Sequence, residues 1–172
     1  TAQQATLIRE DSPTLGAANA PITIVEFLDP ECESCRAVYP IIKRLMQEYD
    51  GQVKLVVRYF PLHRNSVLAA QATEAAGEQG KYWEMQELLF NNQPQWGEKQ
   101  TPQTALFIEY ARTLGLNVEQ FTATLNSGKY ASKIERDRQD AQAVGATGTP
   151  TIFVNGRQVR QLDYASLKAA ID

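Results

Sequence analysis

The 172-residue sequence contains few of the residues that build covalent or metal-stabilised scaffolds. It has two cysteines, Cys32 and Cys35, and one histidine, His63. Two cysteines exclude a scaffold held by several disulfides. They also argue against a structural zinc site, because such a site usually takes four Cys or His ligands. Any thiol or disulfide chemistry of this chain therefore involves Cys32 and Cys35.

Long apolar runs and a strong excess of one charge are also missing. No apolar stretch approaches the roughly 20 residues that span a bilayer, so we expect no membrane span in this chain. The net charge of −3 gives no electrostatic reason to expect nucleic acid or an anionic membrane as a partner. The sequence begins at Thr1 without an initiator Met or a signal-peptide pattern. We therefore expect a removed signal or anchor, or an artificial boundary, before it.

Apolar periodicity predicts an α/β chain. Residues 22–28 and 53–60 are β-branched and aromatic runs typical of buried strands, and apolar residues recur at helical spacing over 32–49. A strand, a helix and a strand joined by short links predict parallel pairing with a right-handed crossover. Pro40 falls inside the predicted helix and cannot donate its backbone bond there.

The middle of the chain has no strand pattern. Apolar residues recur there at helical spacing, and we expect helices at about 65–79, 81–91, 102–114, 117–126 and 130–144. Strand patterns return at 151–154 and 158–160, joined by Asn155-Gly156 in a two-residue type I′ turn. A closing helix at about 164–171 follows Asp163, the predicted N-cap.

The two cysteines stand where the first strand gives way to the helix. A cysteine at a helix N-terminus meets free N–H groups and the helix dipole, which favour the thiolate. The thiolate is the form that attacks in disulfide exchange. We predict that Cys32 attacks the substrate and that Cys35, inside the helix, is less exposed and resolves the mixed disulfide. The alternatives are a structural disulfide or half of a metal site.

Glu26 is the only charged residue in the apolar run 22–28. A buried carboxyl has a raised pKa, and Glu26 could then accept and return the proton of Cys35, directly or through water. Alternatively, Glu26 points outward or pairs with a basic residue such as Arg58 on the next strand. The residues alone leave these interpretations equally open.

Two further features concern the surroundings of the cysteine pair. Thr149-Pro150 lies directly before a strand, where proline is a candidate for a turn or a cis bond. If this turn packs against the Cys32 end of the helix, the backbone of Thr149 could bind a substrate peptide by strand addition. The simpler alternative is a trans proline that opens an edge strand. His63 could form a Cys–His pair, but a loop or capping role is the favoured interpretation.

Taken together, these segments resemble the DsbA-like branch of the thioredoxin superfamily, which comprises periplasmic or extracellular disulfide oxidoreductases. The resemblance covers about residues 8–172. It implies a thioredoxin fold, a central mixed sheet flanked by helices, with an inserted helical subdomain. The matching pieces are ITIVEF, CESC, Tyr59-Phe60-Pro61-Leu62, the long helical block, Gly148-Thr149-Pro150-Thr151 and the turn Phe153-Val154-Asn155-Gly156.

This resemblance assigns the parts of the chain and its site. Residues 1–63 would form the N-terminal part of the thioredoxin fold with the active site, 64–145 the inserted helical subdomain, and 146–172 the C-terminal hairpin and helix. Among the site residues, Cys32 would be the exposed nucleophile and Cys35 the buried resolving thiol. The remaining assignments are Glu26 as the buried acid, Pro150 as a cis-proline, and Thr149, Pro150, Glu33 and Ser34 as substrate-binding residues.

The resemblance also implies the activity. We expect an extracytoplasmic thiol–disulfide oxidoreductase, a monomer that acts on protein or peptide thiols and disulfides with a membrane redox partner protein. Its redox centre would be the Cys32–Cys35 disulfide, with no other cofactor and no metal. The residues leave open whether it is a net oxidase or a reductase. The alternatives are a disulfide isomerase, a Cu(I)-binding protein that uses the two thiolates, or a glutathione-dependent enzyme.

One departure from the family pattern affects the expected redox strength. Strongly oxidising members carry a histidine between the two cysteines, whereas this chain has Glu33 and Ser34 there. The charge of Glu33 disfavours a thiolate on Cys32. We therefore expect a pKa for Cys32 nearer the value of about 7 in thioredoxin than the value of about 3.5 in DsbA. A less oxidising disulfide follows.

Overall fold

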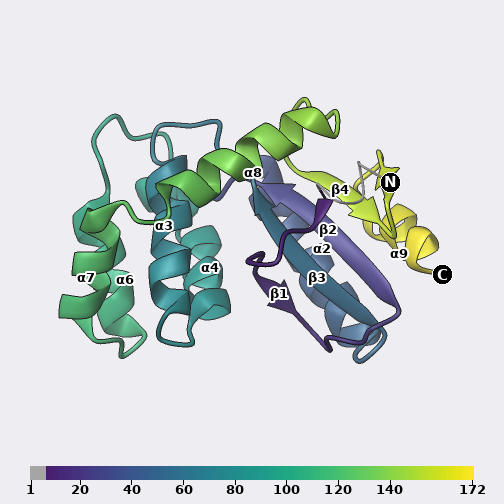
Figure 1. Cartoon of the computed structure of the whole chain (residues 1–172), viewed down its shortest axis with the longest axis horizontal. Coiled ribbons are helices and arrows are strands. Elements are labelled where there is room, and N and C mark those ends of the chain that lie inside the picture. The colour runs from purple at the N-terminus through teal and green to yellow at the C-terminus, as the bar shows by residue number, and fades with distance from the viewer. Residues whose placement is uncertain (1–6) are drawn as a thin grey trace. The chain divides into compact units, whose positions relative to one another are not determined.

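The computed structural model describes residues 7–172 and shows a five-stranded mixed sheet (Figure 1). The strand order is β1-β3-β2-β4-β5, and only β2 and β3 pair in parallel. The expected α/β class and the parallel pair are therefore confirmed. The strands are β1 (Thr14–Leu15), β2 (Ile22–Leu28), β3 (Val53–Tyr59), β4 (Thr151–Val154) and β5 (Arg157–Val159).

The helices lie within two residues of the predicted ranges, with one addition. Helix α5 occupies four residues in a stretch predicted as a link, and four residues are too few to show helical periodicity. Pro40 lies inside α2 as expected. The helices are α2 (Glu33–Glu48), α3 (Ser66–Gly77), α4 (Tyr82–Asn91), α5 (Gln93–Trp96), α6 (Thr104–Thr113), α7 (Val118–Ser127), α8 (Ala131–Ala143) and α9 (Tyr164–Ile171).

The described chain divides into two compact units. The first contains the sheet, most of α2, the end of α8, and α9; it comprises the residues up to 28, 37–60 and 137–172. The second contains the helices α3 to α7, and it also includes the two cysteines; it comprises 29–36 and 61–136. The division of the chain into 1–63, 64–145 and 146–172 stays a prediction, and residues 1–6 lie outside the described range.

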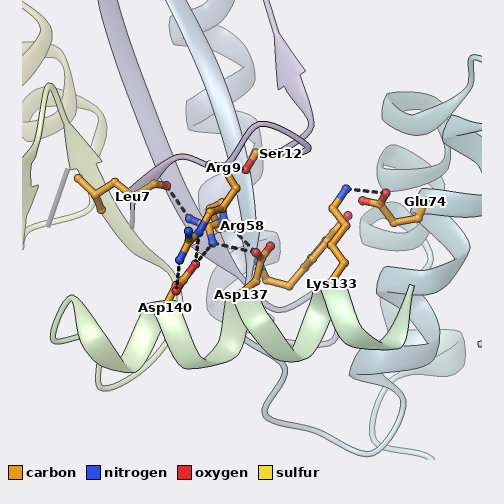
Figure 2. Close-up of polar contacts among 9 residues, drawn as sticks. Leu7, Arg9, Ser12, Arg58, Glu74, Lys133, Asp137 and Asp140 are labelled. Atoms are coloured by element: carbon orange, nitrogen blue, oxygen red, sulfur yellow. Dashed lines mark hydrogen bonds and ion pairs between the residues drawn. The ribbon is translucent and has the colours of Figure 1, made fainter. Parts of the chain in front are cut away.

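A buried arginine organises the first unit. Arg58 on β3 has no exposed surface, and its guanidinium forms ion pairs with Asp137 and Asp140 of α8 (Figure 2). Its Nη1 also donates to the carbonyl of Leu7 at 2.8 Å. Arg9 adds a two-bond contact to Asp140, at 2.8 and 2.9 Å. A charge this deeply buried is tolerated because each guanidinium contact is a hydrogen bond to an oxygen.

The local turn and cap predictions are confirmed in this unit. Asn155 and Gly156 have φ angles of 47° and 83°, the positive pair that a type I′ turn requires. The carboxylate of Asp163 accepts the N–H of Ser166 at 2.7 Å and so caps α9. Both features depend on residues within three positions of one another, which is why sequence alone could find them.

Aromatic side chains fill the core of the second unit. Trp96 is fully buried, and its ring lies edge-on to Phe107 with the centroids 5.1 Å apart. Its indole N–H donates to the carbonyl of Leu89 at 2.9 Å, which satisfies the buried donor. Trp96 and Phe107 therefore belong to the core of the helical unit, together with Phe121 and Tyr110.

Removing one carboxylate from the Arg58 cluster will destabilise the fold. Asp137→Ala takes away a buried ion pair and the acceptor of the Tyr59 N–H. Breaking such a pair should lower the free energy of unfolding by about 3 kcal/mol, measured by urea denaturation. Glu109→Ala breaks an exposed ion pair with Arg112 and is the matched control, with an expected change below about 1 kcal/mol. Equal effects of the two variants would contradict the stabilising role of the cluster.

Candidate active site

The two cysteines differ in exposure, as expected. Cys32 directly precedes α2 and is partly exposed, whereas Cys35 lies in the first turn of α2 and is fully buried. The N–H of Cys32 donates to the carbonyl of Asp29 at 3.0 Å, and the carbonyl of Cys32 accepts the N–H of Arg36 at 3.1 Å. The first cysteine therefore stands at the helix N-terminus, where free N–H groups favour a thiolate.

A buried carboxylate connects the cysteines to the segment that follows β3. The Oδ1 of Asp29 accepts the N–H of Glu31 at 2.9 Å, and its Oδ2 accepts the N–H of Leu62 at 3.0 Å. The same Oδ2 lies 2.6 Å from Nδ1 of His63. The backbone N–H of Asp29 donates to Sγ of Cys35 at 3.5 Å. One residue thus contacts both the sulfur of Cys35 and the imidazole.

A second buried carboxylate lies next to Cys32. Glu31 accepts the N–H of Asn65 at 2.6 Å through Oε1 and the N–H of Glu98 at 2.9 Å through Oε2. Glu98 has a positive φ of 60°, which is uncommon outside glycine, and the bond to Glu31 holds its backbone there. Glu31, the residue directly before Cys32, is therefore hydrogen-bonded to two separate segments of the helical unit.

Gln93 of α5 provides the third connection. Its Nε2 donates to the carbonyl of Pro30 at 2.8 Å and to that of Cys32 at 2.9 Å. This orientation of the amide is fixed, because the opposite one would place an oxygen against two carbonyl oxygens. The buried Oε1 has no hydrogen-bond partner among residues 7–172. A cavity of about 300 Å³ adjoins this site and is lined by Glu31, Glu33, Arg36, Gln93, Pro94, Gly97 and Glu98.

Glu26 belongs to the first unit and is buried in β2. It lies opposite Val57 in the register, whereas its neighbour Phe27 lies opposite Arg58. Because strand residues alternate between the two faces of a sheet, Glu26 and Arg58 lie on opposite faces. Both alternatives for Glu26, the outward position and the pair with Arg58, are therefore wrong. Burial raises the pKa of Glu26 from 4.5 to about 8.

The predicted proline turn also belongs to the first unit. The peptide bond between Thr149 and Pro150 is cis, as the family resemblance implied. Thr151 follows as the first residue of β4, and its hydroxyl donates to the carbonyl of Gly148 at 2.7 Å. That Glu26, Thr149 and Pro150 act together with the cysteines stays a prediction.

The remaining residues predicted to bind substrate, Glu33 and Ser34, are exposed in the first turn of α2. Sequence reasoning missed Asp29, Glu31 and Gln93. The signal that could have found the first two is their position, since both acids lie in the short link between the strand and Cys32. Within the range 7–172, no group of three or more His, Cys, Asp and Glu side chains could hold a metal ion.

Comparison with known proteins now assigns the family. A family model described as thioredoxin matches residues 9–172. The chain belongs to the thioredoxin family. The match covers both the sheet and the helices between β3 and β4, so the family model includes these helices.

Solved structures of the thioredoxin family support the DsbA-like resemblance. BdbD from Bacillus subtilis is 30% identical, with a TM-score of 0.84 over 93% of this chain and 90% of that chain. A thioredoxin-like oxidoreductase from Silicibacter pomeroyi is 29% identical, with a TM-score of 0.83 over 97% and 94%. Wolbachia pipientis alpha-DsbA1 shares the fold, with a TM-score of 0.88 over 100% and 94% at 22% identity. The expected DsbA-like thioredoxin fold is confirmed.

Curated relatives match over a shorter part of their length. The Na⁺/H⁺ antiporter NhaA 3 of Salinispora tropica is 37% identical over 146 residues, which are 83% of this chain. The chain spans about a fifth of that protein, 21% of its length. Among the described residues, no helix combines the length and apolar character needed to cross a membrane.

The buried Glu26 gives the stability of this thioredoxin-family chain a specific pH dependence. Its pKa is about 8 in the folded protein, against 4.5 for an ordinary glutamate. Between these values the folded chain holds a proton that the unfolded chain has released. The free energy of unfolding should therefore fall as the pH rises from about 5 to 8, by on the order of 3–5 kcal/mol.

The measurement is urea denaturation across this pH range for the wild type and Glu26→Gln. The variant cannot ionise, so it should lose this slope and be the more stable protein at pH 8.5. Glu109→Gln, at an exposed glutamate, is the control and should follow the wild type. Parallel profiles for the wild type and Glu26→Gln would show that Glu26 ionises normally.

Proposed function

We propose that this chain is a thiol–disulfide oxidoreductase that exchanges disulfides with protein or peptide substrates through Cys32 and Cys35. The observation that carries the proposal is the arrangement of the pair. A partly exposed cysteine precedes the first turn of a helix, and a fully buried one follows three residues later. The similarity to a thioredoxin-like oxidoreductase over almost the whole chain supports it.

Oxidation of a substrate dithiol by the Cys32–Cys35 disulfide takes two steps. A substrate thiolate attacks Sγ of Cys32 in the Cys32–Cys35 disulfide, and Cys35 leaves as a thiolate that takes up a proton. The second substrate thiolate then attacks the substrate sulfur of the mixed disulfide and releases the thiolate of Cys32. Two electrons pass from the substrate dithiol to the cysteine pair. Reduction of a substrate is the same sequence in reverse.

For Glu26 we propose the exchange of a proton with Cys35, directly or through water. Two arguments support this role, the family resemblance and the pKa of about 8. A group with a pKa close to the working pH both gives and accepts a proton readily. For Thr149, Pro150, Glu33 and Ser34 we propose contact with the substrate peptide. No cofactor beyond the cysteine pair enters this proposal.

The cellular setting is proposed from the DsbA-like resemblance. We infer an extracytoplasmic, periplasmic location, a monomer, and a membrane protein as the redox partner that regenerates the pair. Because Glu33 stands beside Cys32, we also propose a disulfide less oxidising than that of DsbA.

Trapping a mixed disulfide tests the roles of the two cysteines. Cys35→Ala removes the resolving thiol, so a substrate peptide with one disulfide should accumulate covalently on Cys32. Cys32→Ala is the matched control and should trap at least tenfold less, because Cys35 is buried. The product is measured by mass spectrometry. Equal trapping by the two variants would reverse the assignment of the nucleophile.

The reduction potential in glutathione buffers tests the direction of exchange. A reduction potential of about −120 mV, that of DsbA, indicates an oxidase, and one of about −270 mV, that of thioredoxin, indicates a reductase. We expect a value between these two. A chain that shows negligible insulin reduction and binds one Cu(I) tightly would instead be a metal-binding protein.

A further inference from the structure

The surroundings of Cys32 pose an electrostatic problem. Three carboxylates, those of Asp29, Glu31 and Glu33, lie within three positions of it in the sequence. Negative charges close to a thiol disfavour its thiolate. The helix N-terminus offsets part of this effect, and a positive charge held nearby would favour the thiolate of Cys32 further.

His63 is the only histidine of the chain, and the segment before Cys32 holds it in place. Its Nδ1 lies 2.6 Å from Oδ2 of Asp29, and its backbone N–H donates to Oγ of Ser66 at 2.9 Å. The Asp29 carboxylate is fully buried, whereas 42% of the His63 side chain is exposed. An imidazole anchored in this way stays in one orientation while its proton exchanges with solvent.

Asp29 links this imidazole to both cysteines. Its carbonyl accepts the N–H of Cys32 at 3.0 Å, and its N–H donates to Sγ of Cys35 at 3.5 Å. Its carboxylate also accepts two backbone N–H groups, which compensate part of its own charge. The carboxylate can therefore orient the imidazole without cancelling all of the imidazolium's charge.

The charges around His63 favour its protonated form. Burial lowers the pKa of His63, but the hydrogen bond with Asp29 and the charges of Asp29, Glu31 and Cys32 outweigh burial, so that the pKa is raised. Electrostatic interaction between two groups is reciprocal. If negative charge on Cys32 favours the imidazolium, the imidazolium favours the thiolate of Cys32 to the same extent.

We propose that the imidazolium of His63, oriented by Asp29, stabilises the thiolate of Cys32 and takes the place of the histidine that strongly oxidising DsbA-like proteins carry between their cysteines. The proposal rests on disulfide exchange through Cys32. No atom or electron passes to His63, whose proton stays on the ring while the thiolate forms and is consumed. Asp29 is a positioning residue in this arrangement.

A pH dependence follows from the groups that face His63. Below its pKa, the imidazolium offsets the charges of Asp29 and Glu31 beside Cys32. Above its pKa, these two carboxylates remain and the positive charge is lost, so the thiolate becomes less stable. Arg64, the next residue along the chain, donates to Gln100 at 3.2 Å and is absent from the groups that shift the pKa of His63. It therefore offers a matched control.

The first test measures the midpoint of the Cys32 thiolate titration from the pH dependence of iodoacetamide alkylation of the reduced protein. His63→Gln should raise this midpoint by about one pH unit. It should also shift the equilibrium with glutathione about tenfold toward the oxidised protein. His63→Lys should restore most of both values, because it returns a cation. Arg64→Gln should leave both unchanged.

Two results would overturn the proposal. One is a His63→Gln protein with the midpoint and potential of the wild type. The other is an equal shift in His63→Gln and His63→Lys, since His63 would then act through its shape and not its charge. Thermal denaturation of each variant shows whether it is folded under the conditions of the assay.

The second test needs no substitution. Because His63 is the only histidine, a tag-free chain gives one set of imidazole resonances in an NMR titration. The pKa of His63 should be higher in the reduced protein, where Cys32 can carry a negative charge, than in the disulfide form. Equal values in the two forms would overturn the coupling. Failure of the proposed function would appear differently, as the absence of a trapped mixed disulfide with this coupling intact.

Discussion

The hydrogen bonds to the buried carboxylate of Asp29 hold the polypeptide around the two cysteines in place. A charge removed from solvent is costly unless donors surround it, and Asp29 obtains two backbone N–H groups and an imidazole. These donors come from Glu31 and from residues 62 and 63, so the buried carboxylate joins the segment before Cys32 to the segment before α3. Glu31 repeats the arrangement with two further N–H groups. Both acids of the cysteine segment are therefore satisfied largely by backbone N–H groups.

Glu26 is a third buried acid, and burial changes its pKa. It is also buried, but burial raises its pKa to about 8, so that it is largely protonated at neutral pH. The chain therefore carries two kinds of acid close together in sequence. Those before the cysteine pair accept backbone N–H groups, whereas burial raises the pKa of the acid in β2.

Local and repetitive features of this fold could be predicted from the sequence. The strand at 22–28 and the helix at 164–171 end where expected, because uninterrupted β-branched runs and a capping aspartate act over a few residues. The pairing of Glu26 with Arg58 was a wrong alternative, since it ignored the register that places them on opposite faces. The roles of Glu31 and Gln93 were missed because their hydrogen-bond partners lie 34 to 67 positions away. The cis bond before Pro150 followed from the family resemblance and not from local chemistry.

The hydrogen bonds of Gln93 and Glu31 have a consequence for the evolution of this sequence. The residues next to Cys32 are tied to α5, to the start of α3 and to the residue after Gly97, all of them in the helical unit. Substitutions in those helices and links can therefore alter the environment of the sulfurs while the cysteines and their two enclosed residues stay the same. Evolution, or a protein engineer, has in the helical unit a means of diversifying redox behaviour that comparison of the cysteine motif alone would overlook.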